Sequence, residues 1–277
     1  MTTVPTTTGT STRALAPARP FGDRVAGALF DTVDVAWRDL LTLLRTPQAL
    51  IFATIQPMIF VLLFRYAFGG AIRVPGTSYV DYLMPGVFAQ AVAFGAIGTA
   101  VGLAGDLRSG LLVRFRTLPM SRIAVLAGRT LADLARNLLV VAVMVGVGFA
   151  VGFRVANGAA GLFGALALVV AFAYAASWAF VALGLRVSDP EAAQAAAVPV
   201  VFLLVFTSAA FVPSQSMPGW LQAVGTHQPV DALVSAERAL IAGGPATHDV
   251  LICLAWIAGL LLVFVLLAAR SYARMGR

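Results

Sequence analysis

Residues 106–122 read DLRSGLLVRFRTLPMSR, a charged stretch between two long apolar segments. From Leu111 to Leu118 the apolar side chains recur at helical spacing, so they predict one face of a short amphipathic helix. The arginines make the rest of that helix basic, and Pro119 ends it and redirects the chain. Because the sequence on either side is largely apolar, this stretch is where the protein can contact a soluble partner.

A simpler interpretation of the charged stretch is a plain cytoplasmic loop, since such loops carry an excess of basic residues in membrane proteins. That interpretation accounts for the charge. It does not account for the succession of an amphipathic helix, a Pro-Met-Ser turn and a long helix striped with arginine. We therefore interpret residues 106–122 as a docking element.

The composition is that of a membrane protein, with 60% hydrophobic and 11% charged residues. The apolar residues gather into blocks of about twenty, the length that crosses a hydrocarbon core of roughly 30 Å. The sequence therefore predicts an all-α integral membrane protein with six transmembrane helices. In a chain of 277 residues these spans leave no room for a further soluble domain of ordinary size.

Prolines, glycines and charged residues divide the apolar sequence into the predicted spans. The third span belongs to a helix that starts near Met120, outside the membrane, and ends near Phe153. The other spans are expected at residues 50–68, 82–104, 161–185, 192–212 and 250–269.

Two segments precede the transmembrane domain, which we assign to residues 47–277. Residues 1–22 are rich in Thr, Pro and Ala and are interpreted as a flexible cytoplasmic tail. Residues 23–46 alternate apolar and charged positions at helical spacing, which predicts a helix in the membrane interface. In that helix Trp37 is expected at headgroup depth and Arg38 on the polar face.

Arginine supplies all 19 basic residues, and lysine is absent. A phosphate-binding loop of the GxxxxGK[ST] type requires a lysine, so this chain does not carry that motif. Fifteen arginines fall on one side of the six-span order and three on the other, with Arg65 near the second side. Positive charge stays inside, so both termini are predicted to be cytoplasmic, and the net charge of +7 needs no nucleic-acid partner.

The helix after the docking element carries Arg122, Arg129 and Arg136 seven residues apart, with Asp133 four residues after Arg129. This stripe predicts that about half of the helix is cytoplasmic or at the membrane boundary. Asp133, like the other acidic residues near the spans, is then expected at an edge. Coupled carriers usually hold a carboxylate at mid-depth, so this placement argues against a secondary transporter. In the second span, the glycines of the sequence Gly98xxxGly102 are expected to allow close approach of a neighbouring helix.

Two segments resemble the ABC-2 type transporter permeases, and in particular the daunorubicin/doxorubicin-resistance exporter class. One is the loop GLLVRFRTLPMSRIAVLAGR at residues 110–129, between the second and third spans. The other is the outer stretch FVPSQSMPGWLQ at residues 211–222, followed by His227-Gln-Pro229. The order of spans and the N-terminal interfacial helix are similar as well. The resemblance extends over residues 26–270.

The resemblance implies a permease that pairs with a second permease copy and binds ATP-binding-cassette ATPase subunits. ATP and Mg²⁺ would be bound by those subunits, so no cofactor is expected on this chain. The interfacial helix would also touch the ATPase. By resemblance the coupling contact would be formed by Asp106, Arg108, Gly110, Arg114, Arg116, Pro119 and Arg122.

Residues 213–247 form an external segment that is long for a loop. Two short helices are expected in it, the second with Asp231 as N-cap and Gly243 as its stop. The resemblance implies paired re-entrant helices that roof the translocation path, and a surface hairpin of interfacial helices is the alternative. The residues of this segment that carry the prediction are Pro213, Trp220, His227 and Pro229.

The expected translocation path runs between the first, second and fifth spans. Aromatic and amide side chains there suit a lipophilic or aromatic compound, although the same residues are ordinary in helix packing. The path residues are Gln56, Phe60, Gln90, Phe94, Phe202, Phe206 and Ser208.

The sequence therefore predicts the permease subunit of an ATP-driven exporter, without catalysis of its own. The alternative is an ATPase-independent membrane carrier or channel. Two histidines without nearby cysteines or carboxylates do not predict a metal site. A chain rich in arginine, alanine and valine is typical of a GC-rich bacterium, so we expect the bacterial plasma membrane.

Overall fold

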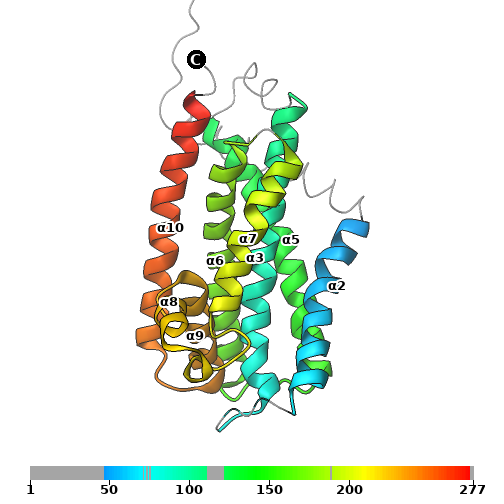
Figure 1. The fold of residues 1–277 in the computed structure, drawn as a ribbon, viewed down its shortest axis with the longest axis vertical. Coiled ribbons are helices and arrows are strands. Elements are labelled where there is room, and N and C mark those ends of the chain that lie inside the picture. The colour runs from blue at the N-terminus through cyan, green and yellow to red at the C-terminus, as the bar shows by residue number, and fades with distance from the viewer. Residues whose placement is uncertain are drawn as a thin grey trace, which may run out of the picture.

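The computed structural model describes residues 47–70, 72, 74, 76–110, 122–187 and 189–274. These residues form a bundle of helices joined by short turns, and no strand occurs among them (Figure 1). In chain order the elements are α2 (Pro47–Leu63), η1 (Phe64–Phe68), α3 (Tyr79–Arg108), α5 (Arg122–Ala150), α6 (Gly158–Gly184), α7 (Pro190–Thr207), η2 (Ser214–Ser216), α8 (Gly219–Gly225), α9 (Pro229–Ala242) and α10 (Thr247–Arg274).

Five of the described helices are long and apolar enough to cross a membrane, namely α3, α5, α6, α7 and α10. The remaining predicted span corresponds to α2 and η1, which together form a shorter apolar helix that ends at Phe68. The order and helical type of the six predicted spans are therefore confirmed, whereas the short helix of the docking element lies outside the described residues. Residues 1–46 lie outside the described part, so the tail and the interfacial helix with Trp37 and Arg38 stay predictions.

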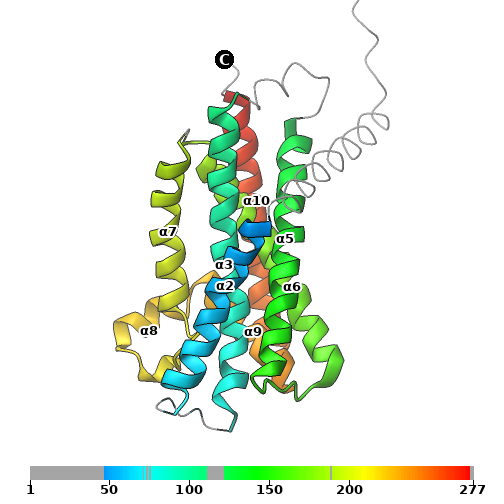
Figure 2. The ribbon, with the colours of Figure 1, turned by 90° about the vertical axis from the view of Figure 1, so that its right-hand side faces the viewer.

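The long helices run side by side, with α3 and α6 inside the bundle (Figures 1 and 2). The most apolar part of α3 is 72% buried, whereas that of α10 is only 11% buried. The end of α3, the start of α5 and the end of α10 share one end of the bundle, and α8 and α9 lie at the opposite end (Figure 1). We call these the inner end and the outer end.

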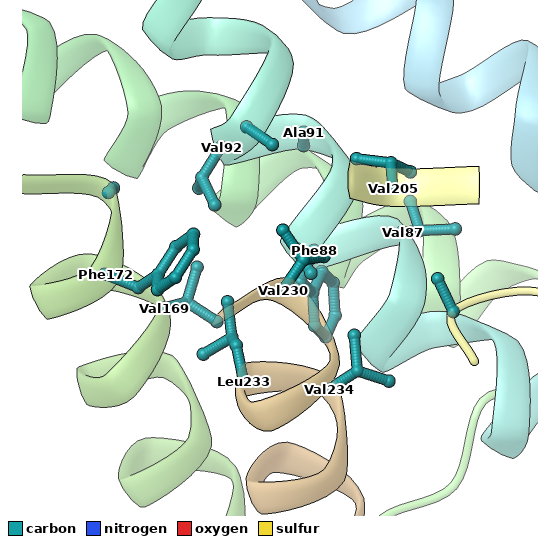
Figure 3. Close-up of a cluster of buried hydrophobic side chains, with 14 of the residues drawn as sticks. Val87, Phe88, Ala91, Val92, Val169, Phe172, Val205, Val230, Leu233 and Val234 are labelled. Atoms are coloured by element: carbon teal, nitrogen blue, oxygen red, sulfur yellow. The ribbon is translucent and has the colours of Figure 1, made fainter. Parts of the chain in front are cut away.

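The main hydrophobic core extends from the middle of the bundle to the outer end. Helix α9 is too short to cross a membrane, yet its apolar side chains insert between α3 and α6 (Figure 3). Phe88 and Val92 of α3 meet Val169 and Phe172 of α6, with Val230, Leu233 and Val234 of α9 against them (Figure 3). Burial of this face fixes α9 as a packed element of the bundle and not as a surface hairpin.

Helix α3 and the turn that follows α7 come unusually close at Gly86. A Cβ atom at this position would lie 2.7 Å from the carbonyl carbon of Ala210 in that turn. Only glycine leaves room for the main chain of the neighbouring segment here. The contact places the end of α7 against the outer part of α3.

Two predicted boundaries are wrong. Helix α7 ends at Thr207 instead of continuing to residue 212, because Ser208 is extended and the chain turns there. Helix α9 begins at Pro229 with Gln228 as its N-cap residue, so Asp231 lies in the first turn and is not the N-cap. The predicted stop is confirmed, because Gly243 has φ +78° and ends α9 in the left-handed conformation.

Replacing Gly86 by alanine is expected to destabilise the protein by about 1–3 kcal/mol, because the new methyl group overlaps the main chain at Ala210. Thermal unfolding in detergent measures the loss. Gly146→Ala is the matched control, since it makes the same change inside α5 where nothing lies within 4 Å. Equal melting temperatures for the two variants would show that the close approach is absent.

Candidate functional site

The inner end of the bundle carries the residues predicted for coupling. Asp106 and Arg108 belong to the last turn of α3, and Gly110 follows with φ +71°. Arg122 is the first residue of α5. The predicted coupling residues Arg114, Arg116 and Pro119 lie outside the described residues. The structure thus places α3 and α5 on either side of the docking element.

An ion pair at the end of α3 reaches the start of α7. Arg108 donates to the Asp189 carboxylate at 3.1 Å, and the two side chains are 70% and 49% exposed. Asp189 also caps α7 by accepting from the main-chain N–H of Ala192. An exposed ion pair of this kind adds little to the stability of the fold. It orients the start of α7 relative to the end of α3.

Deeper in the bundle, Arg129 of α5 forms an ion pair with Asp106 of α3. Both side chains are mostly buried. Gly102 of α3 provides the space, because a Cβ there would overlap the Arg129 guanidinium. Arg129 thus pairs with a carboxylate on another helix, although Asp133 lies four residues after it in α5.

A second polar contact between the same helices lies further along α5. Arg136 forms an ion pair with Asp133 at 3.2 Å and donates to the Gly95 carbonyl of α3 at 2.7 Å. Thr99 of α3 donates its hydroxyl to Asp133 at 2.6 Å. Gly98 makes room for the Arg136 guanidinium, since a Cβ there would lie 2.8 Å from its Nη1 atom. We call this contact and the Arg129–Asp106 ion pair the α3–α5 cross-links.

The cross-links correct one prediction. Gly98 and Gly102 accommodate arginine side chains and not the backbone of a neighbouring helix. Arg129 and Arg136 point into α3, so the arginine stripe packs on a neighbouring helix. Asp133 is buried in the bundle, and its charge is paired with Arg136. The position of Asp133 relative to the membrane boundary stays a prediction, and so does the argument against a secondary transporter.

Three of the predicted path residues come together in an aromatic cluster. Phe60 of α2 lies with its ring centroid 6.0 Å from that of Phe206 in α7, and Phe202 stacks on Phe206 at 4.2 Å. Phe64 and Phe211, which were not predicted, complete the cluster at a centroid distance of 4.7 Å. The rings join α2 to α7 across the outer half of α3.

The other predicted path residues do not form one surface in this structure. Gln56 is exposed on α2 and Phe94 is half-buried, whereas Gln90 and Ser208 are buried. Neither polar atom of the Gln90 amide has a hydrogen-bond partner among the described residues. The Ser208 hydroxyl donates to the Val205 carbonyl at 2.7 Å. A path through these residues stays a prediction.

At the outer end, Arg238 of α9 donates to three main-chain carbonyls. The acceptors are Tyr82 on α3, at 3.0 Å, and Ala209 and Ala210 after α7, at 2.8 and 3.0 Å. The guanidinium lies 3.5 Å from the centroid of the Tyr82 ring. A planar cation with several donors suits this combination of carbonyls and aromatic face.

Ala209 and Ala210 form the turn after α7, and this turn makes two further contacts. The Tyr82 hydroxyl donates to the Ala209 carbonyl at 2.8 Å, and Asp231 accepts from the Ala209 N–H at 2.8 Å. We call Tyr82, Ala209, Ala210, Asp231 and Arg238 the outer junction. It joins α3, α9 and the turn after α7, and the carbonyls of that turn obtain donors there.

Sequence reasoning counted Arg238 as an arginine of the outer aqueous side and missed its role. The available signal was its place beside Glu237 in the middle of an otherwise apolar helix. An arginine in that position needs several acceptors, which only the folded α7 turn supplies.

A cavity of about 1220 Å³ adjoins the outer junction. Its lining combines apolar side chains with hydroxyl and charged groups, which suits an amphiphilic compound. Its lining includes Ile72, Val74, Tyr82, Val212, Pro213, Thr226, Asp231, Ser235 and Arg238. A smaller cavity of about 490 Å³ is lined by Asp81, Tyr82, Arg154 and Arg238, among others.

The predicted residues of the external segment take different positions. Pro213 lines the larger cavity, and Pro229 begins α9. Trp220 on α8 is exposed, as expected of a side chain that contacts lipid headgroups. The His227 ring contacts the Ala223 carbonyl at 2.9 Å at the end of α8. These residues surround the junction but do not converge on one point.

A bundle of apolar helices, with paired charges inside it and an amphiphilic cavity at one end, is the architecture of a multi-pass membrane transporter. The chain belongs to the ABC-2 type transporter family, whose sequence profile matches residues 33–241. Permease proteins of ABC transporters are among the similar proteins.

One relative is a daunorubicin resistance ABC transporter permease protein of Streptomyces coeruleorubidus. It is 36% identical to this chain over 277 residues, which cover 98% of both proteins. A second is a probable doxorubicin resistance ABC transporter permease protein of Mycobacterium tuberculosis, 31% identical over 94% of this chain and 95% of its own length. Another doxorubicin resistance permease protein of that organism is 27% identical over 62% of this chain and 60% of its own.

Replacing Asp133 by leucine is expected to destabilise the protein by about 3–5 kcal/mol, because it leaves the Arg136 guanidinium buried without a carboxylate. The double variant Asp133→Leu/Arg136→Met is expected to be clearly more stable than the single one, since no charge remains buried. Thermal unfolding in detergent compares them. The control Arg108→Ala removes an exposed pair and should cost no more than about 1 kcal/mol. A double variant no more stable than Asp133→Leu would contradict the buried pair.

Proposed function

We propose that this permease exports a lipophilic compound from the cytoplasm or inner leaflet, driven by ATP-binding-cassette ATPase subunits on separate chains. The observation that carries the proposal is the pair of α3–α5 cross-links, which tie together the two helices that flank residues 111–121. The relatives named for daunorubicin and doxorubicin resistance support an aromatic amphiphile as the cargo. The alternative is an ATPase-independent carrier or channel.

The cross-links provide the mechanical step of this proposal. A force applied to the docking element reaches α3 at Arg108, the last residue of that helix, and α5 at Arg122, its first residue. Because the Arg129–Asp106 ion pair joins these helices at one level and hydrogen bonds to α3 from Arg136 and to Asp133 from Thr99 join them at another, they move as one unit and not as independent rods. The unit extends from the inner end to the outer junction, since Tyr82 also belongs to α3.

ATP and Mg²⁺ would be bound by the partner ATPase. Lysine is absent from this chain, so the phosphate-binding lysine of such an ATPase has to come from another subunit. The basic residues of the docking element suit an acidic groove on that subunit.

A second permease copy would complete the transport path. The outward faces of α2 and α7 carry large exposed apolar side chains, among them Ile59, Leu63, Phe202 and Leu203. In a bilayer such a face is covered by lipid or by another helix. The aromatic cluster of Phe60, Phe202 and Phe206 lies on these two helices, so pairing through them would place it beside the path.

The orientation follows from the arginine distribution. The inner end, with Arg108, Arg122, Arg270 and Arg274, would face the cytoplasm, so both termini would be cytoplasmic. The outer junction and its cavity would then lie on the release side of a bacterial plasma membrane.

Changing Arg114 and Arg116 together to glutamate is expected to abolish binding of the ATPase subunit. The two substitutions replace positive by negative charge in the docking element, which then repels an acidic groove. Co-purification of the ATPase in mild detergent measures this. Arg270→Glu/Arg274→Glu is the matched control, with the same charge change at the same end of the bundle, and should keep the ATPase. If the wild-type permease itself brings down no ATPase under several mild detergents, the carrier becomes the better interpretation.

Arg238→Met is expected to lower ATP-dependent export by about tenfold or more, because three carbonyls of the outer junction lose a charged donor. Uptake of doxorubicin by inverted membrane vesicles, divided by the amount of permease, measures export. The control Arg154→Met removes an exposed side chain beside the same region and should retain activity. Wild-type uptake in the Arg238 variant would remove the junction from the mechanism.

A further inference from the structure

Glu237 lies in the buried face of α9, next to Arg238. The apolar stripe of this helix includes Val230, Leu233, Val234 and Ile241, and Glu237 occupies the position between the last two. The side chain is 0% exposed. Figure 3 shows how the neighbouring members of this stripe pack toward α3 and α6. A carboxyl group therefore stands where the helix pattern calls for an apolar residue.

Neither carboxyl oxygen of Glu237 has a hydrogen-bond partner among the described residues. An ionised carboxylate without partners is strongly disfavoured in such surroundings, so the group is neutral there. Burial raises the pKa of Glu237 well above its usual range, and the nearby Arg238 charge opposes the shift only in part.

The Arg238 guanidinium does not neutralise Glu237, because it is engaged on the other side of α9 in the outer junction. It donates there to carbonyls of Tyr82, Ala209 and Ala210, and no ion pair with Glu237 is formed. Adjacent residues of a helix point in different directions, about 100° apart. Glu237 and Arg238 thus face different surroundings.

The elements packed on α9 offer few titratable groups to Glu237. Across the interface, α10 presents the buried thiol of Cys253. Helix α6 carries no charged residue, and its tyrosine belongs to the core cluster at the inner end. The tyrosines of α3 and Asp231 of α9 itself are engaged with the turn after α7, and α7 has no titratable side chain near α9.

We propose that Glu237 is a proton-binding site whose occupancy depends on the position of α9. The site holds a proton while α9 is packed between α6 and α10, and releases it to outside water when α9 moves away from the bundle. The proton returns from the same side when α9 repacks, so no net proton transport results. This inference rests on the proposed function, and it adds to that function a displacement of α9 at the outer end during transport.

The direction of the pH dependence follows from linkage. A glutamate in water titrates near pH 4.3, whereas the packed site holds its proton to a higher pH. Between these two values each unit of pH favours the displaced α9 by about tenfold, because only the packed state keeps the proton. Below the lower value both states are protonated and the preference no longer changes.

Hydrogen–deuterium exchange of residues 229–242 tests the site in the purified full-length permease in nanodiscs. Protection factors, corrected for the intrinsic exchange rate at each pH, are measured from about pH 4 to about pH 9. In the wild type the protection of α9 should fall by up to about tenfold per unit over part of this range. In Glu237→Gln it should stay high and independent of pH, because the amide cannot ionise.

Asp249→Asn, at the start of α10, is the matched control and should keep the wild-type pH dependence. Glu237→Met serves as a second neutral variant and should also remove the dependence. The proton site is overturned if the protection of α9 in the wild type does not change with pH. It is also overturned if the protection in both Glu237 variants changes with pH as much as it does in the wild type.

ATP-dependent uptake by vesicles is measured separately, so that the two proposals fail independently. ATP-dependent export by the wild type together with pH-independent protection of α9 overturns the proton site and leaves the export function standing. Absence of ATP-dependent export together with pH-dependent protection of α9 overturns the export function and supports the proton site.

Discussion

A charge inside a membrane-spanning bundle must be paired, and this constraint explains the central arrangement of the chain. Arg136 lies at the middle of the 29-residue helix α5, and its side chain is mostly buried against α3. Its guanidinium is satisfied by Asp133 and by the Gly95 carbonyl of α3, and Thr99 completes the coordination of the carboxylate. The glycines of α3 are required because arginine side chains occupy the space beside them. Helices α3 and α5 therefore associate through specific polar contacts as well as through apolar packing, which by itself discriminates little between neighbours in lipid.

Helix α3 also carries the contacts at the outer end. Its inner part receives the arginines of α5, and its outer part contributes Tyr82 to the junction and Gly86 to the close approach of Ala210. Both ends of the proposed transport cycle thus involve one rigid element. In the proposed mechanism, a displacement at the docking element is transmitted through α3 to the outer junction. In the proposed proton site, Glu237 adds a group whose charge state differs between packed and displaced α9.

The membrane spans were predictable because they depend on length and hydropathy alone. A block of about twenty apolar residues has to form a helix in the bilayer, since every backbone N–H and C=O needs an internal partner there. The Gly243 stop was predictable for a similar local reason, because the left-handed conformation favours glycine. The partners of Arg129 and Asp133 were not predictable, since a spacing of four residues within α5 competes with an acceptor on another helix. Two residues of the aromatic cluster, Phe64 and Phe211, were also missed, because their meeting depends on how the turn after α7 packs against α2.

The sequence alone determined the class of protein and the order of the membrane-spanning helices, because these follow from apolar length and from proline and glycine positions. The docking stretch and the orientation stay predictions that rest on the distribution of arginine. The tertiary structure decided which charges are buried and what neutralises them. Arg238 and Glu237 are neighbours in sequence, yet one binds the turn after α7 and the other is buried without a partner. That difference arises because α9 packs with one face in the core and another against the outer junction, and no local pattern specifies which elements supply those two environments.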